Sequence, residues 1–489
     1  MNLATGNRKP ETSNQHMKIL YLAHRIPYPP NKGDKIRSFN EIKYLSTKHE
    51  IHLACLADDP KDLKYENDLK KFCKSTNVVL INPKIAKLKS SFYLFSKKPL
   101  SVPYFYSKKL QQTIDHLLST NHYDAIFCFS SPMAEYVFKS KLLVSSCLKL
   151  EKSLVKGLPV TRNEPPETRN HQPSTINQQP TSSNEQLETS NQQPKLIMDF
   201  VDVDSDKWAQ YARYVRFPKS WIYRLESKRL SDYEKKVAES FDHSIFVTDS
   251  EVKIFKNKNP HIKNITAIPN GVDLDYFSPT FSQEQATRNQ PPETGNQNPA
   301  TRVQQPATSN QQRATSNQQP VIVFTGAMDY YANIDGVVWF TKEIFPFVKK
   351  EIPGVQFYIV GSNPAKVVQE LENDDVKVTG YVDDIRPYYQ RASISVVPLR
   401  IARGIQNKIL EAMAMAKPVI TTSKALEGIN AIPGQDLLIG DSAGQLIDQI
   451  TRLLRDERKA KTLGTSARSH VEKEYSWQRN MEIFNHIFF

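Results

Sequence analysis

The chain has 489 residues, 39% of them hydrophobic, which is long enough for two domains that each bury a sizeable core. Its 65 Lys and Arg residues exceed its 52 Asp and Glu residues, so the net charge of 65 − 52 = +13 favours an anionic partner such as a nucleotide, a nucleic acid or a membrane surface. We find no signal peptide and no apolar run near the ~18 residues of a membrane-spanning helix, so we expect neither a spanning protein nor export by the usual route.

Three stretches contain almost no apolar residues and repeat a Gln/Asn/Thr/Pro theme, in fragments such as "ETSNQ" and "INQQPTSSNEQ". A chain of this composition buries too little surface to offset its conformational entropy, so we predict that these stretches are disordered. The predicted organisation is a disordered extension at 1–16, an N-terminal domain at 17–280 with a disordered insertion at about 158–194, a disordered linker at 281–319, and a C-terminal domain at 320–489 whose last helix packs back on the N-terminal domain.

Apolar, β-rich runs alternate with helical patterns along both predicted domains. In the first domain, strands are predicted at 18–23, 50–57, 77–82, 123–130, 195–200 and 243–249, and helices at 34–47, 60–73, 107–119 and 219–240. In the second, strands are predicted at 321–327, 355–361, 376–382, 393–399, 417–422 and 437–440. Short apolar strands between helices are typical of parallel sheets covered on both faces, so the predicted fold class is α/β, with two doubly wound, Rossmann-like domains.

The four cysteines, Cys55, Cys73, Cys128 and Cys147, have no CxxC or metal-ligand spacing. We therefore expect buried thiols in a reducing compartment, the cytoplasm, and no metal site.

In open parallel sheets, ligands bind outside the carboxyl ends of the strands, and conspicuous residues follow several of the predicted strands. Gly33 precedes a helix after the first strand, where a phosphate could approach the backbone. A Pro/Gly loop at such a place can equally be an ordinary turn, so Gly33 alone decides nothing.

The segment "DFVDVDSDKW" (199–208) places four carboxylates within eight residues, ahead of a predicted helix. Two interpretations stay open. In the first, Asp204 or Ser205 is simply the N-cap of the helix. Alternatively, Asp202, Asp204 and Lys207 bind hydroxyl groups or act in acid/base chemistry.

The segment "PLRIARGIQNKILEAMAMAKP" (398–418) leaves another strand and opens a helix. The helix-start amides, Arg403 and Lys408 would present positive potential to a diphosphate. Glu411 lies one helical turn beyond Lys408 on the same face, where its carboxylate can accept two hydrogen bonds from a ribose diol. The alternative is an ordinary surface Lys–Glu pair.

This last segment resembles the signature of the nucleotide-sugar glycosyltransferases of family 4, and "IPNGVDLDYFSP" (268–279) resembles that family's last strand and turn before its second domain. With "DFVDVDSDKW" and "FTGAMDYYANIDGVVWF" (324–340), the resemblance narrows to the branch associated with exosortase/PEP-CTERM surface systems. It covers nearly the whole chain outside the three polar stretches. It implies the GT-B arrangement, in which two Rossmann-like domains face a cleft and the C-terminal one holds the nucleotide. It also implies transfer with retention of configuration, without a cofactor or a structural metal.

The resemblance implies roles for individual residues. Glu411 would bind the ribose, Lys408 the diphosphate, and the loop "GYVDD" (380–384) would read the base through its backbone. The predicted donor-binding residues are Gly33, Gly326, Tyr381, Val382, Gly404, Ile405 and Glu411, and the predicted catalytic residues are Arg403 and Lys408. Because the leaving phosphate can itself take the acceptor's proton, the protein would supply orientation and charge stabilisation rather than a nucleophile–base pair.

Two positions depart from the family pattern. The family's glutamate eight residues before position 411 is replaced by Arg403, and segment 326–336 lacks the usual Arg and Lys that follow the first strand of the second domain. We predict that Arg403 and Lys408 together replace that phosphate-binding pair. The residues that contact the donor sugar, and therefore the sugar itself, stay open.

Two basic stretches of the N-terminal domain bear on the acceptor. Residues 84–109 contain seven lysines and no acid, and residues 207–236 contain nine basic and three acidic residues with interleaved aromatic side chains. Such stretches suit an anionic lipid surface, or else they are solvated helix faces over core aromatics. The predicted function is sugar transfer to a glycan or polyprenyl-linked acceptor for surface polysaccharide synthesis, at the inner face of the cell membrane and with no nucleic-acid partner.

Three other functions remain open. A phosphorylase of this fold would need a lysine-bound pyridoxal phosphate, and no lysine stands out for that role. A nucleotide-sugar epimerase of the same fold would convert the donor without an acceptor. A non-catalytic scaffold would bind membrane or nucleic acid through its charge alone. Incubation with labelled nucleotide sugars separates these functions by their products.

Overall fold

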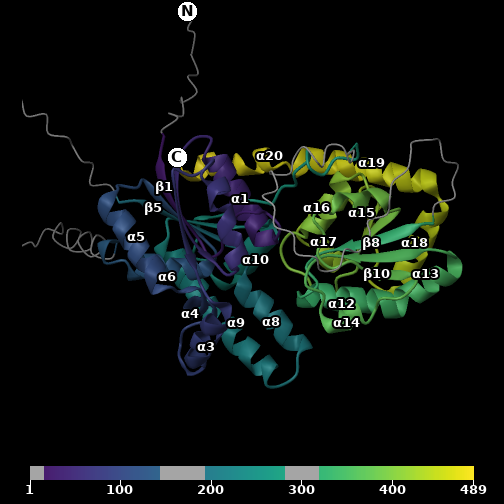
Figure 1. Ribbon diagram of the computed structural model, residues 1–489, viewed down its shortest axis with the longest axis horizontal. Helices are drawn as coiled ribbons and strands as arrows, with labels where there is room; N and C mark the ends of the chain where they lie inside the picture. Colours follow the sequence, from purple (N-terminus) through teal and green to yellow (C-terminus); the bar gives the residue numbers. More distant parts are fainter. Residues whose placement is uncertain (1–15, 144–192, 281–318, 489) are drawn as a thin grey trace, which may run out of the picture.

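The computed structural model of the protein describes residues 16–143, 193–280 and 319–488 (Figure 1). The stretches predicted to be disordered, 1–16, 158–194 and 281–319, lie almost wholly outside the described residues.

Seven parallel strands form the sheet of the N-terminal domain, in the spatial order β3-β2-β1-β4-β5-β6-β7 (Figure 1). They are β1 (Lys18–Ala23), β2 (Glu50–Ala57), β3 (Ser75–Leu80), β4 (Ala125–Phe129), β5 (Lys195–Val201), β6 (His243–Phe246) and β7 (Ile265–Ala267). The chain winds outward from β1 to one edge of the sheet and then returns through β4 to the other edge. This is a doubly wound α/β domain.

Six parallel strands form the sheet of the C-terminal domain, in the order β10-β9-β8-β11-β12-β13. They are β8 (Val321–Thr325), β9 (Gln356–Val360), β10 (Val376–Val378), β11 (Ile394–Val397), β12 (Val419–Thr421) and β13 (Leu438–Ile439). The winding reverses between β8 and β11, as it does between β1 and β4 in the first domain. The predicted fold class, α/β with two doubly wound parallel sheets, is confirmed.

Helices cover both faces of each sheet (Figure 1). Those of the N-terminal domain are α1 (Gly33–Leu45), η1 (Pro60–Tyr65), α2 (Glu66–Leu69), α3 (Pro83–Ser91), η2 (Phe92–Phe95), α4 (Ser101–Phe105), α5 (Lys108–Thr120), η3 (Ser131–Met133), α6 (Ala134–Lys139), α8 (Asp204–Tyr214), α9 (Lys219–Ser240) and α10 (Asp249–Lys258). Those after β8 are α12 (Tyr331–Trp339), η4 (Phe340–Ile344), α13 (Phe345–Glu351), α14 (Lys366–Gln369), α15 (Arg386–Arg391), α16 (Asn407–Ala414), α17 (Ser423–Leu426), α18 (Ala443–Arg455), α19 (Glu457–Glu474), α20 (Trp477–Met481) and α21 (Phe484–Phe488). Within the described ranges, none of these helices is both long enough and apolar enough to cross a membrane.

The C-terminal helices return to the first domain. In Figure 1, α19 and α20 run across the top of both lobes. The ring of Phe484 lies 5.7 Å from that of Phe127 in β4, and Met481 and Phe484 belong to the same buried cluster as Ile19. The end of the chain therefore completes the core of the domain where the chain began.

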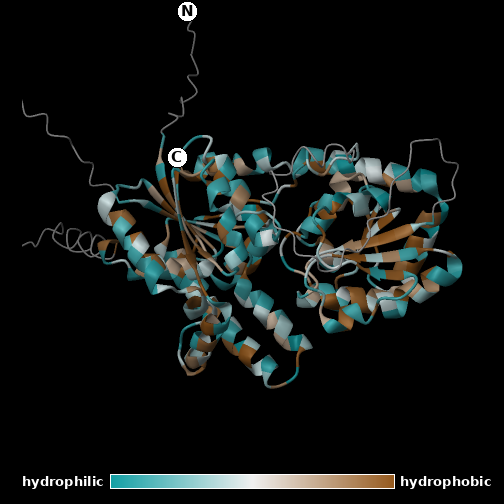
Figure 2. Ribbon diagram, viewed as in Figure 1, coloured by the Kyte–Doolittle hydropathy of each residue, from teal (hydrophilic) through white to brown (hydrophobic). Residues whose placement is uncertain are grey.

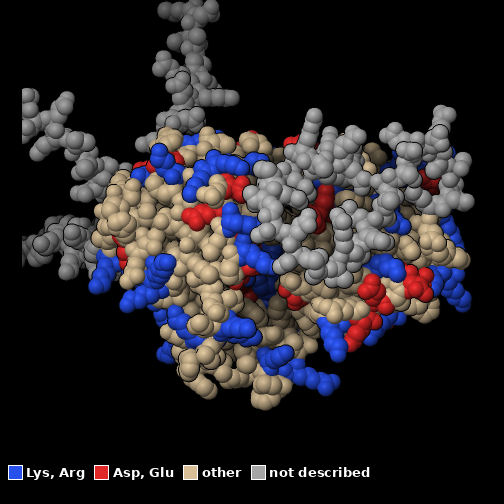
Figure 3. All heavy atoms as spheres, viewed as in Figure 1, with Lys and Arg blue, Asp and Glu red and all other residues tan. Residues whose placement is uncertain are grey.

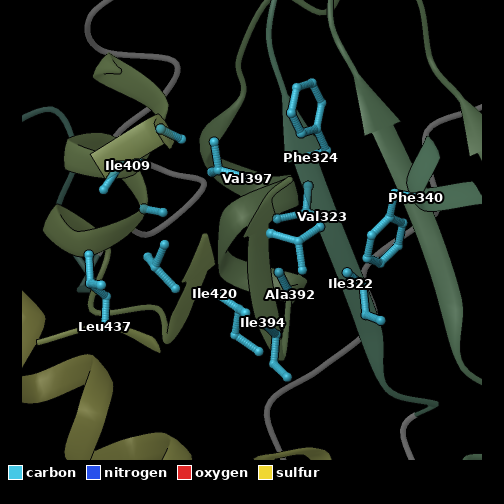
Figure 4. Packing of buried hydrophobic residues seen from close by; sticks show 14 of the residues in the cluster. Ile322, Val323, Phe324, Phe340, Ala392, Ile394, Val397, Ile409, Ile420 and Leu437 are labelled. Atoms are coloured by element: carbon cyan, nitrogen blue, oxygen red, sulfur yellow. The ribbon is translucent and has the colours of Figure 1, made fainter. Parts of the chain in front are cut away.

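The strands carry the apolar core of both lobes, as the brown strands of Figure 2 show. In the C-terminal domain, Val323 and Ile394 of adjacent strands belong to one buried cluster with Phe340 of η4 and Ile409 of α16 (Figure 4). This packing fixes α16 on the sheet. In the N-terminal domain, Cys55, Cys73 and Cys128 are buried free thiols, as expected, whereas Cys147 lies outside the described residues.

Two local expectations are wrong. The segment predicted as one helix at 60–73 is a 3-10 helix followed by a single α-helical turn, because Pro60 starts a tighter turn that the amphipathic pattern does not reveal. The last strand before the second domain is β7, which ends just before the segment 268–279 that was expected to contain it.

Candidate active site

The predicted site is built around the start of α16, which follows β11 at the point where the winding of the C-terminal sheet reverses. Gly404, in the loop before the helix, has φ +60, and a Cβ atom there would lie 2.2 Å from Oδ1 of Asp202 in the other domain. Glycine is therefore required both by the turn and by the close approach. The next residue, Ile405, packs partly buried against the core of the C-terminal domain.

Lys408 points from the first turn of α16 toward the end of β8. Its Nζ donates a hydrogen bond to Oδ1 of Asn333 at 3.0 Å, and a Cβ atom added to Gly326 would lie 3.2 Å from its Cε. Burial lowers the pKa of Lys408 to about 8, although the Glu411 carboxylate acts against this shift. The site thus holds a buried cation that lies beside a neutral amide and 5.3 Å from the centre of the Phe324 ring.

Glu411 lies one turn further along α16. Its Oε2 accepts a hydrogen bond from the Tyr389 hydroxyl at 3.2 Å, and that hydroxyl is 2.7 Å from Oγ1 of Thr325. Burial raises the pKa of Glu411, while the Tyr389 hydrogen bond and the Lys408 charge oppose the shift. Among the ion pairs of the described residues, none joins Lys408 to Glu411, so the interpretation as an ordinary surface pair is wrong.

The loops after β8, β9 and β10 meet beside this helix at the carboxyl edge of the sheet. The Gly326 amide donates to the Val360 carbonyl at 3.0 Å, and the Gly361 amide donates to the Gly380 carbonyl at 3.2 Å. The loop after β10 carries Tyr381, which is 68% exposed, and Val382, which is partly buried against the core. Backbone groups and one exposed ring therefore border the start of α16.

The N-terminal domain approaches the same helix through the start of α1. A Cβ atom at Gly33 would lie 3.9 Å from Nδ2 of Asn407, the first residue of α16. Asn407 also accepts a hydrogen bond at 3.2 Å from Asn270, which in turn accepts one from the fully buried Arg37. The structure therefore brings Gly33, Gly326, Gly404, Ile405, Lys408 and Glu411 together at the meeting point of the two sheets' carboxyl edges.

The acidic segment after β5 contacts the loop that leads into this helix, because Asp202 lies against Gly404. The register of β5 shifts between Asp199 and Val201, and Val201 has φ +67. This irregularity turns the following residues toward the loop of Gly404. Burial raises the pKa of Asp202, with the charge of Lys207 opposing it, and Lys207 itself pairs with Asp204.

Arg403 joins the two domains. Its guanidinium pairs with Asp206 and lies 3.7 Å from Oε1 of Glu251, whose pKa is raised to about 7 by burial and by the nearby Asp202 carboxylate. Its buried Nε has no hydrogen-bond partner among the described residues. Part of the cation is therefore already neutralised by acidic groups of the N-terminal domain, and one donor is left for another group.

The interpretation of Asp204 or Ser205 as an N-cap is wrong. Helix α8 begins at Asp204, and its N-cap residue is Val203. The exposed amides are instead satisfied from other helices: Glu234 accepts from the Ser205 amide at 2.9 Å, and Glu251 accepts from the Val203 amide at 2.6 Å. Burial raises the pKa of Glu234 to about 8.

Several residues of this arrangement carry no signal in the sequence. Asn333, Tyr389 and Asn407 reach the site from three separate helices, and each is unremarkable in its own segment. Arg37 could have been suspected only as a charged residue on the buried face of a predicted helix. Within the described ranges, no group of three or more His, Cys, Asp and Glu side chains is placed to hold a metal ion.

Comparison with known proteins bears first on the domain that contains α16. Residues 319–456 match the family model described as "Glycosyl transferases group 1". This match covers most of the C-terminal domain, which is therefore similar to the group 1 glycosyltransferases.

Curated relatives match the chain only over part of their length. The chain is 28% identical over 180 residues to a trehalose synthase of Pyrococcus horikoshii, covering 33% of the chain and 42% of the relative. It is 23% identical over 258 residues to a GDP-mannose-dependent monoacylated alpha-(1-6)-phosphatidylinositol monomannoside mannosyltransferase of Corynebacterium glutamicum, covering 50% of the chain and 61% of the relative. The chain thus spans about half the length of these relatives.

Solved structures match over the full length of the chain and show its fold. The sucrose-phosphate synthase of Thermosynechococcus elongatus superposes with a TM-score of 0.60 at 16% identity, covering 97% of this chain and 98% of that one. HepE of Anabaena in complex with UDP superposes with a TM-score of 0.56 at 12% identity, covering 96% and 99%. Together with the similarity to the group 1 glycosyltransferases, the two doubly wound sheets make this the GT-B fold.

Proposed function

We propose that the protein transfers a sugar from a nucleotide-sugar donor to a glycan or polyprenyl-linked acceptor, with retention of configuration. The observation that carries the proposal is the start of α16, where Lys408 and Glu411 stand on one helical turn inside a domain similar to the group 1 glycosyltransferases. The helix amides and Lys408 would hold the diphosphate, and Glu411 would hold the ribose. Gly326, Tyr381 and Val382 would border the base, and Gly33, Gly404 and Ile405 the phosphates and sugar.

In the reaction, the bond between the sugar and the diphosphate breaks while the acceptor hydroxyl attacks the same face of the sugar. The acceptor's proton passes to the leaving phosphate oxygen, so the protein needs no separate base. Lys408 and the unpartnered Nε of Arg403 would stabilise the growing negative charge of the diphosphate. Asp202, Asp204 and Lys207, across the cleft, would orient the acceptor hydroxyl.

The features that support the proposed acceptor and pathway are less specific than those of the donor site. The resemblance to the exosortase/PEP-CTERM branch favours a surface polysaccharide or glycoconjugate as the product. The basic stretches 84–109 and 207–236 would bring the protein to an anionic membrane surface, where a polyprenyl-linked acceptor is held.

The proposal is tested first by a donor screen. HepE has been solved with UDP and with UDP-glucose, and the Corynebacterium relative is named as GDP-mannose-dependent, so these two nucleotide sugars head the screen. A donor that binds only the folded protein raises its melting temperature by mass action. Glu411→Ala should weaken binding of that donor by about 2–4 kcal/mol, because two hydrogen bonds to a charged group are lost.

The second step incubates the protein with the labelled donor that binds. We expect transfer to an added acceptor, or slow hydrolysis without one, and the anomeric configuration of the product should match that of the donor. Epimerised donor would replace the proposal by an epimerase. If no donor binds, or if Glu411→Ala leaves the donor affinity unchanged, the assignment of the site fails.

A further inference from the structure

One end of the N-terminal domain exposes large apolar side chains. On α3 and the 3-10 helix η2 these are Ile85, Leu88, Phe92 and Phe95, of which Phe92 is 77% exposed and Phe95 is 91% exposed. The buried residues of α3 are the small Ala86 and Ser90. A surface helix of a globular protein normally turns its large apolar residues inward, so α3 is inverted.

The turn between α8 and α9 exposes a second apolar group. Phe217 is 80% exposed, and Tyr214 and Trp221 on either side of it are also exposed. The more central aromatic residues of the same stretch, Trp208 and Tyr223, pack against each other with tilted rings whose centroids are 4.9 Å apart, and they are only partly exposed. The aromatic residues of 207–236 thus divide into a packed set and an exposed set at the tip.

The two groups belong to one surface. Arg229 of α9 donates to the backbone carbonyls of Tyr93 and Leu94 in η2, at 3.2 and 2.8 Å. Glu226, on the same helix, accepts from the Leu100 and Ser101 amides. Figure 1 accordingly shows α3 beside α9 at the lower end of the N-terminal lobe, near the turn between α8 and α9.

Cations surround these apolar side chains. Residues 83–101 contain five lysines and no acidic residue, and residues 212–224 contain four basic residues and no acidic one. Of the five lysines, Lys98 is paired with Glu135, whereas Lys84, Lys87 and Lys97 are exposed. Figure 3 shows this end as tan surface bordered by blue Lys and Arg side chains, and Figure 2 shows brown residues at the same place.

We propose that this end of the protein is a docking face for an anionic phospholipid bilayer. The docking face consists of Ile85, Leu88, Phe92, Phe95, Phe217 and Trp221, with Lys84, Lys87, Lys97, Arg213, Arg216 and Lys219 around them. The apolar side chains enter the boundary between headgroups and acyl chains, and the cations remain among the phosphates. A nucleic acid would satisfy the cations but would leave the exposed aliphatic and aromatic side chains in water.

This inference deepens the membrane contact in the proposed function, and it relates the membrane to the site. Helix α8 begins at Asp204, two residues after Asp202, and ends at Tyr214, next to Arg213 of the docking face. Its 11 residues span about 16 Å at 1.5 Å per residue. The acidic segment is therefore at most about that far from the end of α8 at the docking face, within reach of the headgroup of a lipid-linked acceptor.

The test uses the full chain and needs no transferase activity. The protein is sedimented with vesicles of phosphatidylglycerol and phosphatidylcholine in equal parts, and with vesicles of phosphatidylcholine alone. We expect binding to the anionic vesicles only, weakened by salt because the attraction is screened. The variant Lys84→Gln with Lys87→Gln and Lys97→Gln should bind roughly a hundredfold more weakly, since each charge contributes about a fivefold factor.

Apolar insertion is tested with Phe92→Ser combined with Phe95→Ser, which should weaken vesicle binding at least about tenfold. The matched control lies in the other domain, where Phe347 is 57% exposed and lysines are also at the surface. Phe347→Ser, and Lys342→Gln with Lys350→Gln and Lys366→Gln, should bind vesicles as the parent does. In the parent, tryptophan fluorescence should shift to the blue on binding, and Trp221→Phe should remove that shift.

Three results would overturn the docking face. They are failure of the parent to sediment with anionic vesicles, loss of as much binding in the control variants as in the docking-face variants, and a fluorescence shift that survives Trp221→Phe. Binding of the donor nucleotide is measured on the same variants and should be unchanged. Loss of vesicle binding with intact donor binding separates the membrane contact from the transferase, and loss of both would show that a variant has misfolded.

Discussion

The charge of Lys408 depends on pH in the range where the protein would work. Burial lowers its pKa to about 8 from the ~10.4 of a free lysine. The ammonium is therefore fully present well below pH 8 and is lost as the pH rises through that value. A bound diphosphate favours the charged form, so its binding should take up a proton between about pH 8 and pH 9.

We therefore expect the affinity for a nucleoside diphosphate to fall up to about tenfold for each pH unit above 8. Calorimetry in buffers of different ionisation enthalpy measures both the affinity and the proton uptake. The bare nucleoside should show neither effect. Lys408→Arg keeps its charge throughout and should flatten the profile. An unchanged profile in that variant would assign the titration to another group.

Arg403 is the residue whose role is least fixed by its surroundings, because it contacts Asp206 and Glu251 and still has a free Nε donor. If it stabilises the departing diphosphate, Arg403→Ala should lower kcat by about 10²–10³ with a smaller change in KM. Arg403→Lys keeps a charge but loses the planar fork and should lie between Arg403→Ala and the parent. Arg403→Glu would face Asp206 and Glu251 as a like charge and should be inactive.

Asp206→Asn supplies the control, since it removes the charge of the partner but leaves the guanidinium in place. If Arg403 only holds the two domains together, Asp206→Asn and Arg403→Ala should lower kcat by similar factors. If Arg403 instead acts on the diphosphate, kcat should fall much more in Arg403→Ala than in Asp206→Asn. Activity of Arg403→Glu equal to that of the parent would remove Arg403 from the charge-stabilising role altogether.

At the scale of elements, α1 is held by a buried ionic network. Arg37 is fully buried and forms ion pairs with Asp199 of β5 at 2.7 Å and with Glu41 one turn along the helix at 3.0 Å, and it donates a hydrogen bond to the Ile268 carbonyl after β7 at 2.8 Å. Burial raises the pKa of Glu41, with Asp199 adding to the shift and Arg37 opposing it. The guanidinium thus compensates two carboxyl groups that have little access to water.

Arg37→Met should lower the free energy of unfolding by about 3–5 kcal/mol, because it leaves buried charge uncompensated. Urea denaturation measures the change. Adding Asp199→Asn and Glu41→Gln to Arg37→Met should recover part of the loss, since the stranded charges are removed as well. Arg213→Met, at an exposed position of α8, should change little. If Arg37→Met and Arg213→Met lowered the free energy of unfolding equally, the ion pairs of Arg37 would contribute nothing measurable to stability.

The elements themselves were largely predictable, because each strand is a short apolar run bounded by turn residues. The predicted strands at 18–23 and 50–57 coincide with β1 and β2, and the predicted helix at 219–240 coincides with α9.

The site was only partly predictable. Lys408 and Glu411 could be found because one helical turn places them on one face, whereas Asn333 and Tyr389 reach them by tertiary contacts that leave no local pattern.

At the scale of the whole molecule, the two domains meet through side chains that border the candidate site. Asn270 bonds to Asn407, Arg403 pairs with Asp206, and the hydroxyl of Tyr211 bonds to that of Tyr330. The C-terminal helices add a second connection, with α20 packed against α1. A structure held at both places does not depend on the polar linker between the domains to set their arrangement.

The polar stretches should therefore be replaceable without loss of fold or function. Replacing 160–192 and 284–318 each by a flexible Gly/Ser linker of about 12 residues keeps the ends joined, and loop length changes closure entropy only by about 0.6 kcal/mol per doubling. We expect a single cooperative thermal transition close to that of the parent, and an unchanged affinity for the donor nucleotide. Calorimetry and donor titration of the two single replacements and of their combination measure this. Their Gln/Asn/Thr/Pro composition offers little apolar surface to bury, so a large fall in melting temperature in either replacement would show that the stretch contributes contacts which its composition does not predict.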